Sequence, residues 1–364
     1  MIRCIRCILP ETYPGISFDN KGVCNFCNNY KDFIPKGEGA LINYFRKAKT
    51  KKRFYDALVP ISGGKDSTYI LYLAKKVYDL NILAFTFDNG FFSDIALKNI
   101  KSAIAKTSVD HIFYKPNWDV LKRMYRATLL KTGELCSACG IGLFVSYLKI
   151  SADWDTPLIL LGRSPVEEDS YTPEEIYDIN RFKAIIKDAK NVPTEEMNRF
   201  LFYPNLNPLL KIIYTKFGKF GEVIAPLYYL SRKNESEIGE ILRKEMGWEG
   251  LGSAGYAKHF DCTAEPFSNF LREHRYGYSR RVCHYSNLIR MGEIRTDEAL
   301  EMLGRERPHE EPETLDTILE KLELSRDDLG KIIKVKPFQY EQYCYAEKKG
   351  IKTIRPFYNR LRKK

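Results

Sequence analysis

The central part of the chain alternates short apolar runs with longer segments whose apolar residues recur every three or four positions. The short runs have the length of buried strands and lie at residues 56–61, 81–87, 111–114 and 157–161. The segments 67–77 and 92–106 between them have the spacing of amphipathic helices. Strands that alternate with helices are typical of parallel sheets covered on both faces. The pattern therefore predicts an α/β fold with a doubly wound parallel sheet.

The regions on either side of this alternation have other patterns. The stretch from about residue 172 to 220 shows no clear period and is expected to be irregular, whereas residues 234–246 and 296–303 have helical spacing. The first 30 residues are rich in turn-forming residues and too poor in apolar positions to bury a core of their own. We therefore expect four parts: an N-terminal unit (1–35), the α/β domain (50–230), a helical region (231–303) and a basic helical tail (304–364).

The composition is that of a globular protein, and the positive charge is concentrated near the C-terminus. The chain has 364 residues, 44% of them hydrophobic, which is enough for two or three domains with cores. No apolar run approaches the roughly 20 residues that span a bilayer, and the first residues do not resemble a signal peptide, so we expect a cytoplasmic protein without membrane insertion. Of the net charge of +11, residues 325–364 contribute twelve Lys or Arg against four Asp or Glu. Such a segment is either a solvated helix or a contact for a polyphosphate, a nucleic acid or an acidic partner.

Two Cys-x-x-Cys pairs lie in the first 30 residues. Cys4 and Cys7 form the first pair, and Cys24 and Cys27 follow after sixteen intervening residues. In a reducing compartment this paired spacing favours a metal over disulfides. Four thiolates suit tetrahedral Zn²⁺, and a structural zinc ion would supply the stability that this segment lacks. The sequence therefore predicts a four-cysteine zinc knuckle.

A third pair, Cys136 and Cys139, is expected to end a helical stretch that follows Gly133. Three interpretations are open: a second zinc site completed by Cys262 or Cys283, a [4Fe–4S] cluster, or buried thiols without a ligand. An iron–sulfur cluster requires thiolates from separate segments to converge. The spacing along the chain does not decide between these interpretations.

The strongest chemical motif is the run SGGKDS at residues 62–67, between the first predicted strand and its helix. Doubly wound sheets bind ligands at this edge. The glycines let backbone N–H groups approach an anion, the helix directs its positive end toward it, and Lys65 and Ser67 add donors. Because the run is shorter than the phosphate loop of kinases and GTPases, its lysine is placed differently. The motif predicts a phosphate site.

The run SGGKDS after a hydrophobic strand resembles the PP-loop of ATP pyrophosphatases, which cleave ATP between the α and β phosphates and adenylate a substrate oxygen. The resemblance implies ATP and Mg²⁺ as cofactors, Lys65 and Asp66 as catalytic residues, and Asp66 or Asp88 as a ligand of Mg²⁺. Gly162 and Arg163 follow the last core strand, so we expect them at the same edge of the sheet. The candidate ATP-binding residues are Ser62, Gly63, Gly64, Lys65, Asp66, Ser67, Phe87, Asp88, Gly162 and Arg163.

The two N-terminal cysteine pairs with the residues around them, together with the segment 258–300, narrow the resemblance. Both are similar to N-acetyl sugar amidotransferases of surface-polysaccharide biosynthesis, and the match is collinear over about residues 1–303. In that family ATP activates the carbonyl oxygen of an acetamido group on a nucleotide sugar, and ammonia then displaces AMP. The resemblance implies a separate glutaminase and cyclase-type partner as the ammonia source, in agreement with the lack of a recognisable glutaminase motif here.

A basic group in the C-terminal half is the candidate substrate site, and it comprises Lys258, His259, Arg280 and Arg281. Arginines interleaved with tyrosines suit a nucleotide diphosphate or an RNA backbone equally well. Arginines that only pack among tyrosines at the surface are the alternative.

Cys262 departs from the sugar amidotransferase pattern. Together with Cys136 and Cys139 it resembles the three cluster ligands of PP-loop tRNA thiolases. Sulfur transfer to a nucleobase, a tRNA or a small molecule is therefore the second candidate function. A non-catalytic zinc-knuckle protein that binds nucleic acid is the third candidate, and it leaves the phosphate loop unexplained.

Overall fold

The computed structural model describes residues 2–167, 179–189, 192–201, 220–250 and 261–336. Its centre is a five-stranded sheet in the order β3-β2-β1-β4-β5, and every pair of neighbouring strands is parallel. The strands are β1 (Ala57–Pro60), β2 (Ile82–Phe87), β3 (Asp110–Tyr114), β4 (Leu158–Leu160) and β5 (Glu222–Ile224). This topology confirms the predicted doubly wound α/β fold.

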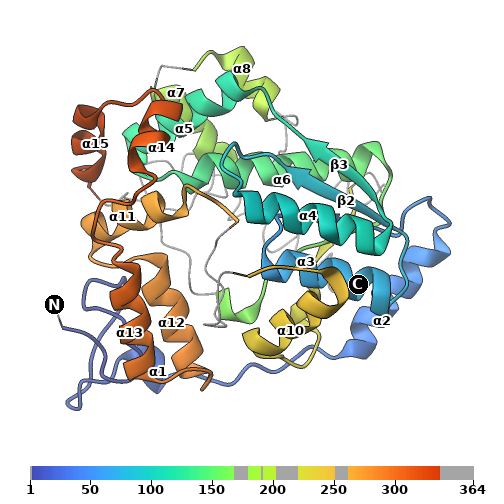
Figure 1. The fold of residues 1–364 in the computed structure, drawn as a ribbon, viewed down its shortest axis with the longest axis horizontal. Helices are drawn as coiled ribbons and strands as arrows, with labels where there is room; N and C mark the ends of the chain where they lie inside the picture. The colour runs from blue at the N-terminus through green and yellow to red at the C-terminus, as the bar shows by residue number, and fades with distance from the viewer. Residues whose placement is uncertain (1, 168–178, 190–191, 202–219, 251–260, 337–364) are drawn as a thin grey trace, which may run out of the picture.

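Alternating side chains of the strands divide between two apolar cores. Leu58 and Phe85 face one side of the sheet, whereas Val59 and Ala84 face the other, as the two-residue period of a strand requires. Figure 1 shows helices in front of and behind the strands. One layer contains α2 (Glu38–Thr50), α3 (Lys65–Tyr72), α4 (Asp94–Thr107) and α10 (Glu235–Met246). The other contains α5 (Trp118–Thr132), α6 (Cys136–Asp153), α7 (Ile179–Ala189) and α8 (Thr194–Phe200).

Local chemistry explains where these helices begin and end. The Asn117 side chain caps α5 by accepting from the backbone N–H of Val120, and Gly133 ends the same helix in the left-handed conformation. Asn234 and Glu237 form a reciprocal capping box at the start of α10. After Tyr72, α3 continues as a π-helical turn (η1, Leu73–Val77), and short 3₁₀ turns follow β4 and β5 (η2, Pro165–Glu167; η3, Pro226–Tyr228).

The C-terminal helices divide into two groups. α11 (Glu265–Tyr276), α14 (Leu315–Lys321) and α15 (Arg326–Ile333) contribute to the apolar core that covers α5 and α6. α12 (Arg280–Arg290) and α13 (Thr296–Glu306) pack instead with the N-terminal segment and its short helix α1 (Asn25–Asn28), which lies beside them in Figure 1. Residues 304–336 therefore belong to the body of the molecule, and the rest of the basic tail lies outside the described residues.

Two expectations about local structure are wrong. The region 172–220, expected to be irregular, contains α7 and α8, because Phe182, Ile185 and Ile186 provide an apolar helix face that is completely buried. Cys136 begins a helix rather than ending one. The N-terminal segment, expected to lack a core of its own, buries its apolar residues, Ile8 and Leu9 among them, against α12 and α13. Within the described residues, no helix is long and apolar enough to cross a membrane.

Candidate functional site

The phosphate loop is held tightly between β1 and its neighbours. Gly63 has φ +78°, and a Cβ atom there would lie 2.3 Å from the carbonyl oxygen of Ala96 in α4. The carbonyl oxygen of Gly63 accepts from Asn99 Nδ2 at 3.1 Å and from Trp248 Nε1 at 3.0 Å. Only glycine fits this backbone conformation and this contact, and two elements outside the loop fix its position.

The loop ends in the N-terminus of α3, whose first turn has an anion-binding arrangement. Gly64 occupies the cap position, and no side chain caps the helix. The Ser67 hydroxyl accepts from the backbone N–H of Ser62 at 3.1 Å, and the Thr68 hydroxyl donates to the carbonyl oxygen of Gly64 at 2.8 Å. A helix N-terminus of this kind favours phosphate through its N–H groups and its dipole.

The structure brings the candidate ATP-binding residues to one edge of the sheet. Phe87 ends β2 and is buried, and the carboxylate of Asp88 beside it accepts from the N–H of Gly90 at 2.9 Å. A Cβ atom on Gly162 would lie 2.7 Å from the backbone nitrogen of Ser67, so the segment after β4 packs directly on the loop. Arg163 follows it with an exposed side chain.

Lys65 is buried beside a carboxylate of α10 and a carboxylate of its own helix. Its Nζ lies 2.6 Å from Glu235 Oε1, at the first residue of α10, and 3.4 Å from Asp66 Oδ1. His284 of α12 places Nε2 3.7 Å from the same Glu235 oxygen. Burial alone would raise the pKa of Glu235, but Lys65 and His284 hold it below its ordinary value. Burial raises the pKa of Asp66, and the attraction of Lys65 opposes that rise.

The carboxylate of Asp66 fits a divalent cation. Its Oδ1 is buried and has no hydrogen-bond partner among the described residues. Lys65 Nζ, 3.4 Å away, offsets part of the cost of burying this charge, and a bound cation would offset more of it. Mg²⁺ prefers carboxylate and phosphate oxygens, so Asp66 and the phosphates of a nucleotide on this loop are suitable ligands.

Asp261 is a site residue that the sequence analysis did not assign. A Cβ atom on Gly64 would lie 3.2 Å from Asp261 Oδ2, so this carboxyl group touches the phosphate loop. Burial raises its pKa, and a hydrogen bond with Ser62 acts in the opposite direction. The backbone oxygen of Asp261 accepts from the N–H of Ser93, which fixes the segment beside the end of β2. Its position next to the candidate cluster ligand Cys262 was the available signal.

The third cysteine pair lies near Cys262, on the same side of the molecule. Cys136 and Cys139 occupy the first turn of α6, and Cys262 pairs with Phe92 in an antiparallel bridge. All three thiols interact electrostatically with the buried hydroxyl of Tyr125. Burial raises the pKa of Cys139 to about 12, and the negative charge of a Cys136 thiolate adds to the rise. Burial and the charge of Cys139 likewise raise the pKa of Cys262.

The Sγ atoms of these three residues do not all lie within 4.8 Å of one another. In the described part of the chain, only the N-terminal cysteines bring three or more potential metal-ligating atoms within 4.8 Å of one another. The chemistry of the donor set does fit a larger cationic group, because three thiolates that repel one another would be stabilised by iron. Cys283 lies elsewhere, buried in the cluster around the N-terminal segment.

The candidate substrate residues fall into two classes. Arg280 begins α12 half-buried, with its backbone N–H donated to Asn269 Oδ1 at 3.3 Å. Arg281 is buried and lies 3.3 Å from each of two carboxylates, Glu265 and Glu306. Arg281 therefore forms ion pairs with α11 and α13. Lys258 and His259 lie outside the described residues.

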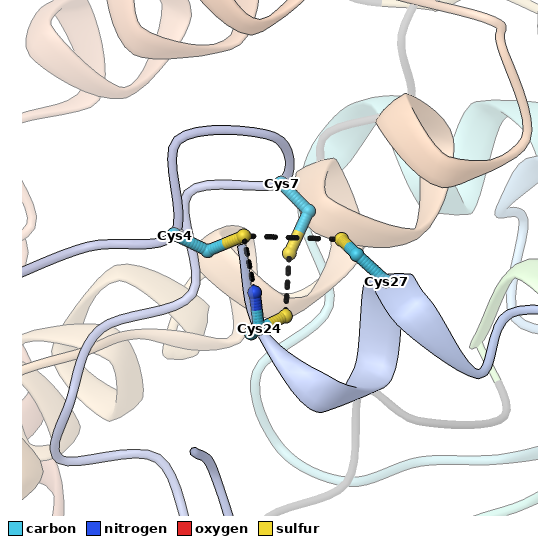
Figure 2. Close-up of side chains that lie close together, drawn as sticks. All are labelled: Cys4, Cys7, Cys24 and Cys27. Atoms are coloured by element: carbon cyan, nitrogen blue, oxygen red, sulfur yellow. Dashed lines mark hydrogen bonds between the residues drawn. The ribbon is translucent and has the colours of Figure 1, made fainter. Parts of the chain in front are cut away.

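The four N-terminal cysteines form a compact buried group (Figure 2). Their Sγ atoms all lie within 4.8 Å of one another, with 3.6 Å between Cys7 and Cys24 and 3.9 Å between Cys4 and Cys27. The backbone N–H of Cys24 donates to Cys4 Sγ at 3.2 Å. A hydrogen bond from Cys27 lowers the pKa of Cys7 to about 5 against the effect of burial. Four clustered thiols with a backbone donor fit a structural Zn²⁺.

Helix α12 holds this group from one side. Arg290 Nη1 donates to Cys7 Sγ at 3.3 Å, and the Ser286 hydroxyl donates to the carbonyl oxygen of Cys7. The Thr296 hydroxyl of α13 donates to the carbonyl oxygen of Arg6 at 3.0 Å. A guanidinium next to a thiolate offsets part of the negative charge that four cysteines give to a zinc site.

The C-terminal part of the chain is similar to a known protein family. Residues 254–357 match the family model described as the C-terminal domain of WbpG-like LPS biosynthesis proteins. The C-terminal region is similar to that family. A search of curated proteins found no match.

Among solved structures, the chain is similar to the U34-tRNA thiolase NcsA from Methanococcus maripaludis with its [4Fe–4S] cluster. The two are 16% identical, and the similarity covers 86% of this chain and 91% of that chain with a TM-score of 0.34. At this TM-score the likeness carries no argument about function. The fold and the site described above therefore rest on the residues of this chain.

Proposed function

We propose that this protein is an ATP pyrophosphatase that replaces the carbonyl oxygen of an acetamido group on a nucleotide sugar with nitrogen. One observation carries the proposal. Asp261 lies within the segment that matches the WbpG-like LPS biosynthesis domain, and its carboxyl group touches Gly64 of the phosphate loop. A segment typical of surface-polysaccharide biosynthesis therefore borders an anion site of the kind that holds a nucleotide.

The proposed reaction has two steps. The acetamido oxygen attacks the α-phosphorus of ATP, the bond to the β-phosphate breaks, and pyrophosphate leaves. Ammonia then adds to the carbon of the O-adenylated group, and the bond from that carbon to oxygen breaks. AMP leaves with the former carbonyl oxygen, and the sugar carries an acetamidino group.

The loop residues would act on the charge that develops during the first step. Negative charge grows on pyrophosphate as it departs, and the N-terminus of α3 and Lys65 would stabilise it. Asp66, together with Asp88, would hold the Mg²⁺ that offsets phosphate charge. Phe87, Gly162 and Arg163 would border the nucleotide. The α/β domain (50–230) would thus activate the substrate, and the region 231–303 would contact the sugar nucleotide and the partner.

Ammonia would come from a separate glutaminase and cyclase-type partner. This part of the proposal is supported by the resemblance of the chain to sugar amidotransferases, which receive ammonia in this way. Ammonium salts should replace the partner in vitro, because ammonia can diffuse into a site that is open to solvent.

Sulfur transfer is the second candidate, and the grouping of Cys136, Cys139 and Cys262 favours it. These thiolates would hold a [4Fe–4S] cluster that supplies sulfide when bound. Activation by ATP would be the same, and the acceptor would be a nucleobase, a tRNA or a small molecule. The two candidates therefore share the activation by ATP and differ in the incoming atom and in the acceptor.

The test uses anaerobically purified protein, ATP, Mg²⁺ and a nucleotide sugar with an acetamido group. We expect AMP and pyrophosphate, and mass spectrometry should detect an amidine when ammonium is present. A product that forms only with sulfide, from protein that contains iron, would favour the second candidate. Release of ADP and inorganic phosphate would contradict both.

A further inference from the structure

The phosphate-loop lysine is held by a residue that comes from a distant part of the chain. Lys65 and Glu235 are both buried, and 2.6 Å separates Lys65 Nζ from Glu235 Oε1. Glu235 is the first residue of α10, and the capping box of Asn234 and Glu237 fixes that end of the helix. A lysine ammonium has three donors, so it can bind Glu235 and a phosphate together. The carboxylate therefore limits the directions in which Lys65 can point.

A third helix reaches the same carboxylate. His284 Nε2 lies 3.7 Å from Glu235 Oε1, is buried, and has no hydrogen-bond partner among the described residues. Among the described residues, the charged or titratable groups that interact with Glu235 include Lys65 and Asp66 of α3 and His284 of α12. A carboxylate beside a polyphosphate would be repelled, and an imidazole at this distance offers it a second partner.

The helix that carries His284 is also attached to the four-cysteine group. On α12, Ser286 and Arg290 are four residues apart and contact Cys7, whereas His284 contacts Glu235. Asn287 Nδ2 donates to the carbonyl oxygen of Val166 at 2.7 Å, in the segment that follows Gly162. One helix therefore touches the four-cysteine group, the segment after β4 and the ion pair of the phosphate loop.

We propose that Glu235 and His284 are positioning residues that orient Lys65, and that α12 transmits the order of the four-cysteine group to the phosphate loop. This inference rests on the proposed function, in which Lys65 binds a phosphate of ATP. It gives the four-cysteine group a role beyond local stability. If this group lost its ordered structure, α12 would shift and would displace His284 and then Lys65.

The test measures AMP formation in variants of the full chain loaded with zinc. Glu235→Ala frees Lys65 and should lower kcat about 10- to 100-fold with a much smaller change in KM for ATP, because Lys65 acts mainly on charge that develops in the transition state. Glu235→Gln keeps the size and one acceptor and should recover part of the loss. Glu240→Ala, an exposed position on the same helix, is the matched control and should be unaffected.

A double-mutant cycle tests the connection through His284. If Glu235 and His284 act together, Glu235→Ala combined with His284→Ala should lose little more than Glu235→Ala alone. Thermal midpoint and zinc content identify any variant that has failed to fold, and Glu235→Gln with His284→Gln repeats the cycle with smaller changes.

The results distinguish failure of the proposed function from failure of this inference. Wild-type protein that forms no AMP overturns the proposed function and this inference with it. AMP formation by the wild type with a Glu235→Ala variant equal to Glu240→Ala overturns only the positioning of Lys65. Strictly additive losses in the cycle overturn the transmission through α12.

Discussion

The molecule contains two groups of cysteines that share the Cys-x-x-Cys spacing and differ in almost everything else. The N-terminal four are buried, all within 4.8 Å of one another, and receive hydrogen bonds from Cys24 N–H and Arg290. Cys136, Cys139 and Cys262 are half-buried, lie farther apart and neighbour Asp261, which touches the phosphate loop. A closed set of four ligands is typical of structural metal sites, whereas an open set is typical of reactive ones. The same spacing therefore has different consequences in different surroundings.

The difference arises from the elements that carry the thiols. Cys4 and Cys7 lie in a turn, Cys24 is the N-cap residue of the short helix α1 and Cys27 lies within that helix, so their backbones curl around one point. Cys136 and Cys139 are one helical turn apart on α6, and Cys262 comes from a segment that pairs with Phe92, in the connection between β2 and α4. From this comparison we expect that substitution of a cysteine in the first group unfolds part of the molecule. Substitution of a residue at the phosphate loop should instead stop AMP formation.

The largest expected effect lies on the phosphate-loop side. Lys65→Ala should lower the rate of AMP formation about 100- to 1000-fold, because a buried positive charge is lost where phosphate charge develops. The variant also loses the buried ion pair with Glu235 and should have a lower thermal midpoint, but its zinc content should stay close to that of the wild type. Steady-state kinetics checks this, with Lys76→Ala, an exposed position near the end of the same helical segment, as the control. A Lys65→Ala variant that keeps full activity would remove the loop from the reaction.

The next effect concerns the four-cysteine group. Cys24→Ser should release about one zinc ion per chain and lower the free energy of unfolding by roughly 4 kcal/mol, because loss of a structural metal is among the most damaging changes. Metal analysis and thermal unfolding measure both quantities. Cys283→Ser, in the same buried cluster but outside the four, should keep its zinc. Equal zinc content in the two variants would contradict the assignment of a metal to this group.

Cys262→Ser should have a smaller effect on stability, and its effect on product formation should distinguish the two candidate functions. Exchange of sulfur for oxygen should cost about 1–2 kcal/mol of packing at most. If the incoming atom is nitrogen, AMP formation with ammonium salts should survive. If these thiols hold a cluster that delivers sulfur, the brown colour and product formation should both disappear while ATP still binds. Absorbance of anaerobic protein and product analysis distinguish the two results.

The smallest effect is a dependence of stability on pH. The folded state holds the pKa of Glu235 below its ordinary value, so this carboxylate contributes stability above the pKa of the unfolded chain, roughly 4.3. That contribution is lost as the pH falls toward the folded pKa. The free energy of unfolding of Glu235→Gln should therefore fall less steeply than that of the wild type below pH of about 5. Parallel curves would show that Glu235 is not held ionised by Lys65.

Much of the α/β domain could be predicted because its signals are local. Short apolar runs predicted β1 to β4, helical apolar spacing predicted the helices α3 and α4 between them, and the glycines of residues 62–67 marked the loop. The connections between distant segments could not be predicted. Glu235 binds a lysine 170 positions away, and nothing in its local sequence distinguishes it from other acidic residues at helix starts.

The cysteines also show that local spacing is informative and that contacts between distant segments cannot be predicted from it. Their spacing predicted the four-membered group, because both pairs lie within 24 residues, from Cys4 to Cys27. It could not predict that Cys262 would lie near Cys136 and Cys139 while Cys283 would not, since that outcome depends on how α11 and α12 pack. Arg281, expected at the substrate, is neutralised by two carboxylates from other helices.

The most direct test of the central claim follows one oxygen atom. A nucleotide sugar labelled with ¹⁸O in its acetamido carbonyl is incubated with the protein, ATP, Mg²⁺ and ammonium, and the AMP is analysed by mass spectrometry. The account predicts that AMP carries the label and that the sugar carries an amidine without it. AMP without ¹⁸O, or nucleotide product in the form of ADP, would contradict it.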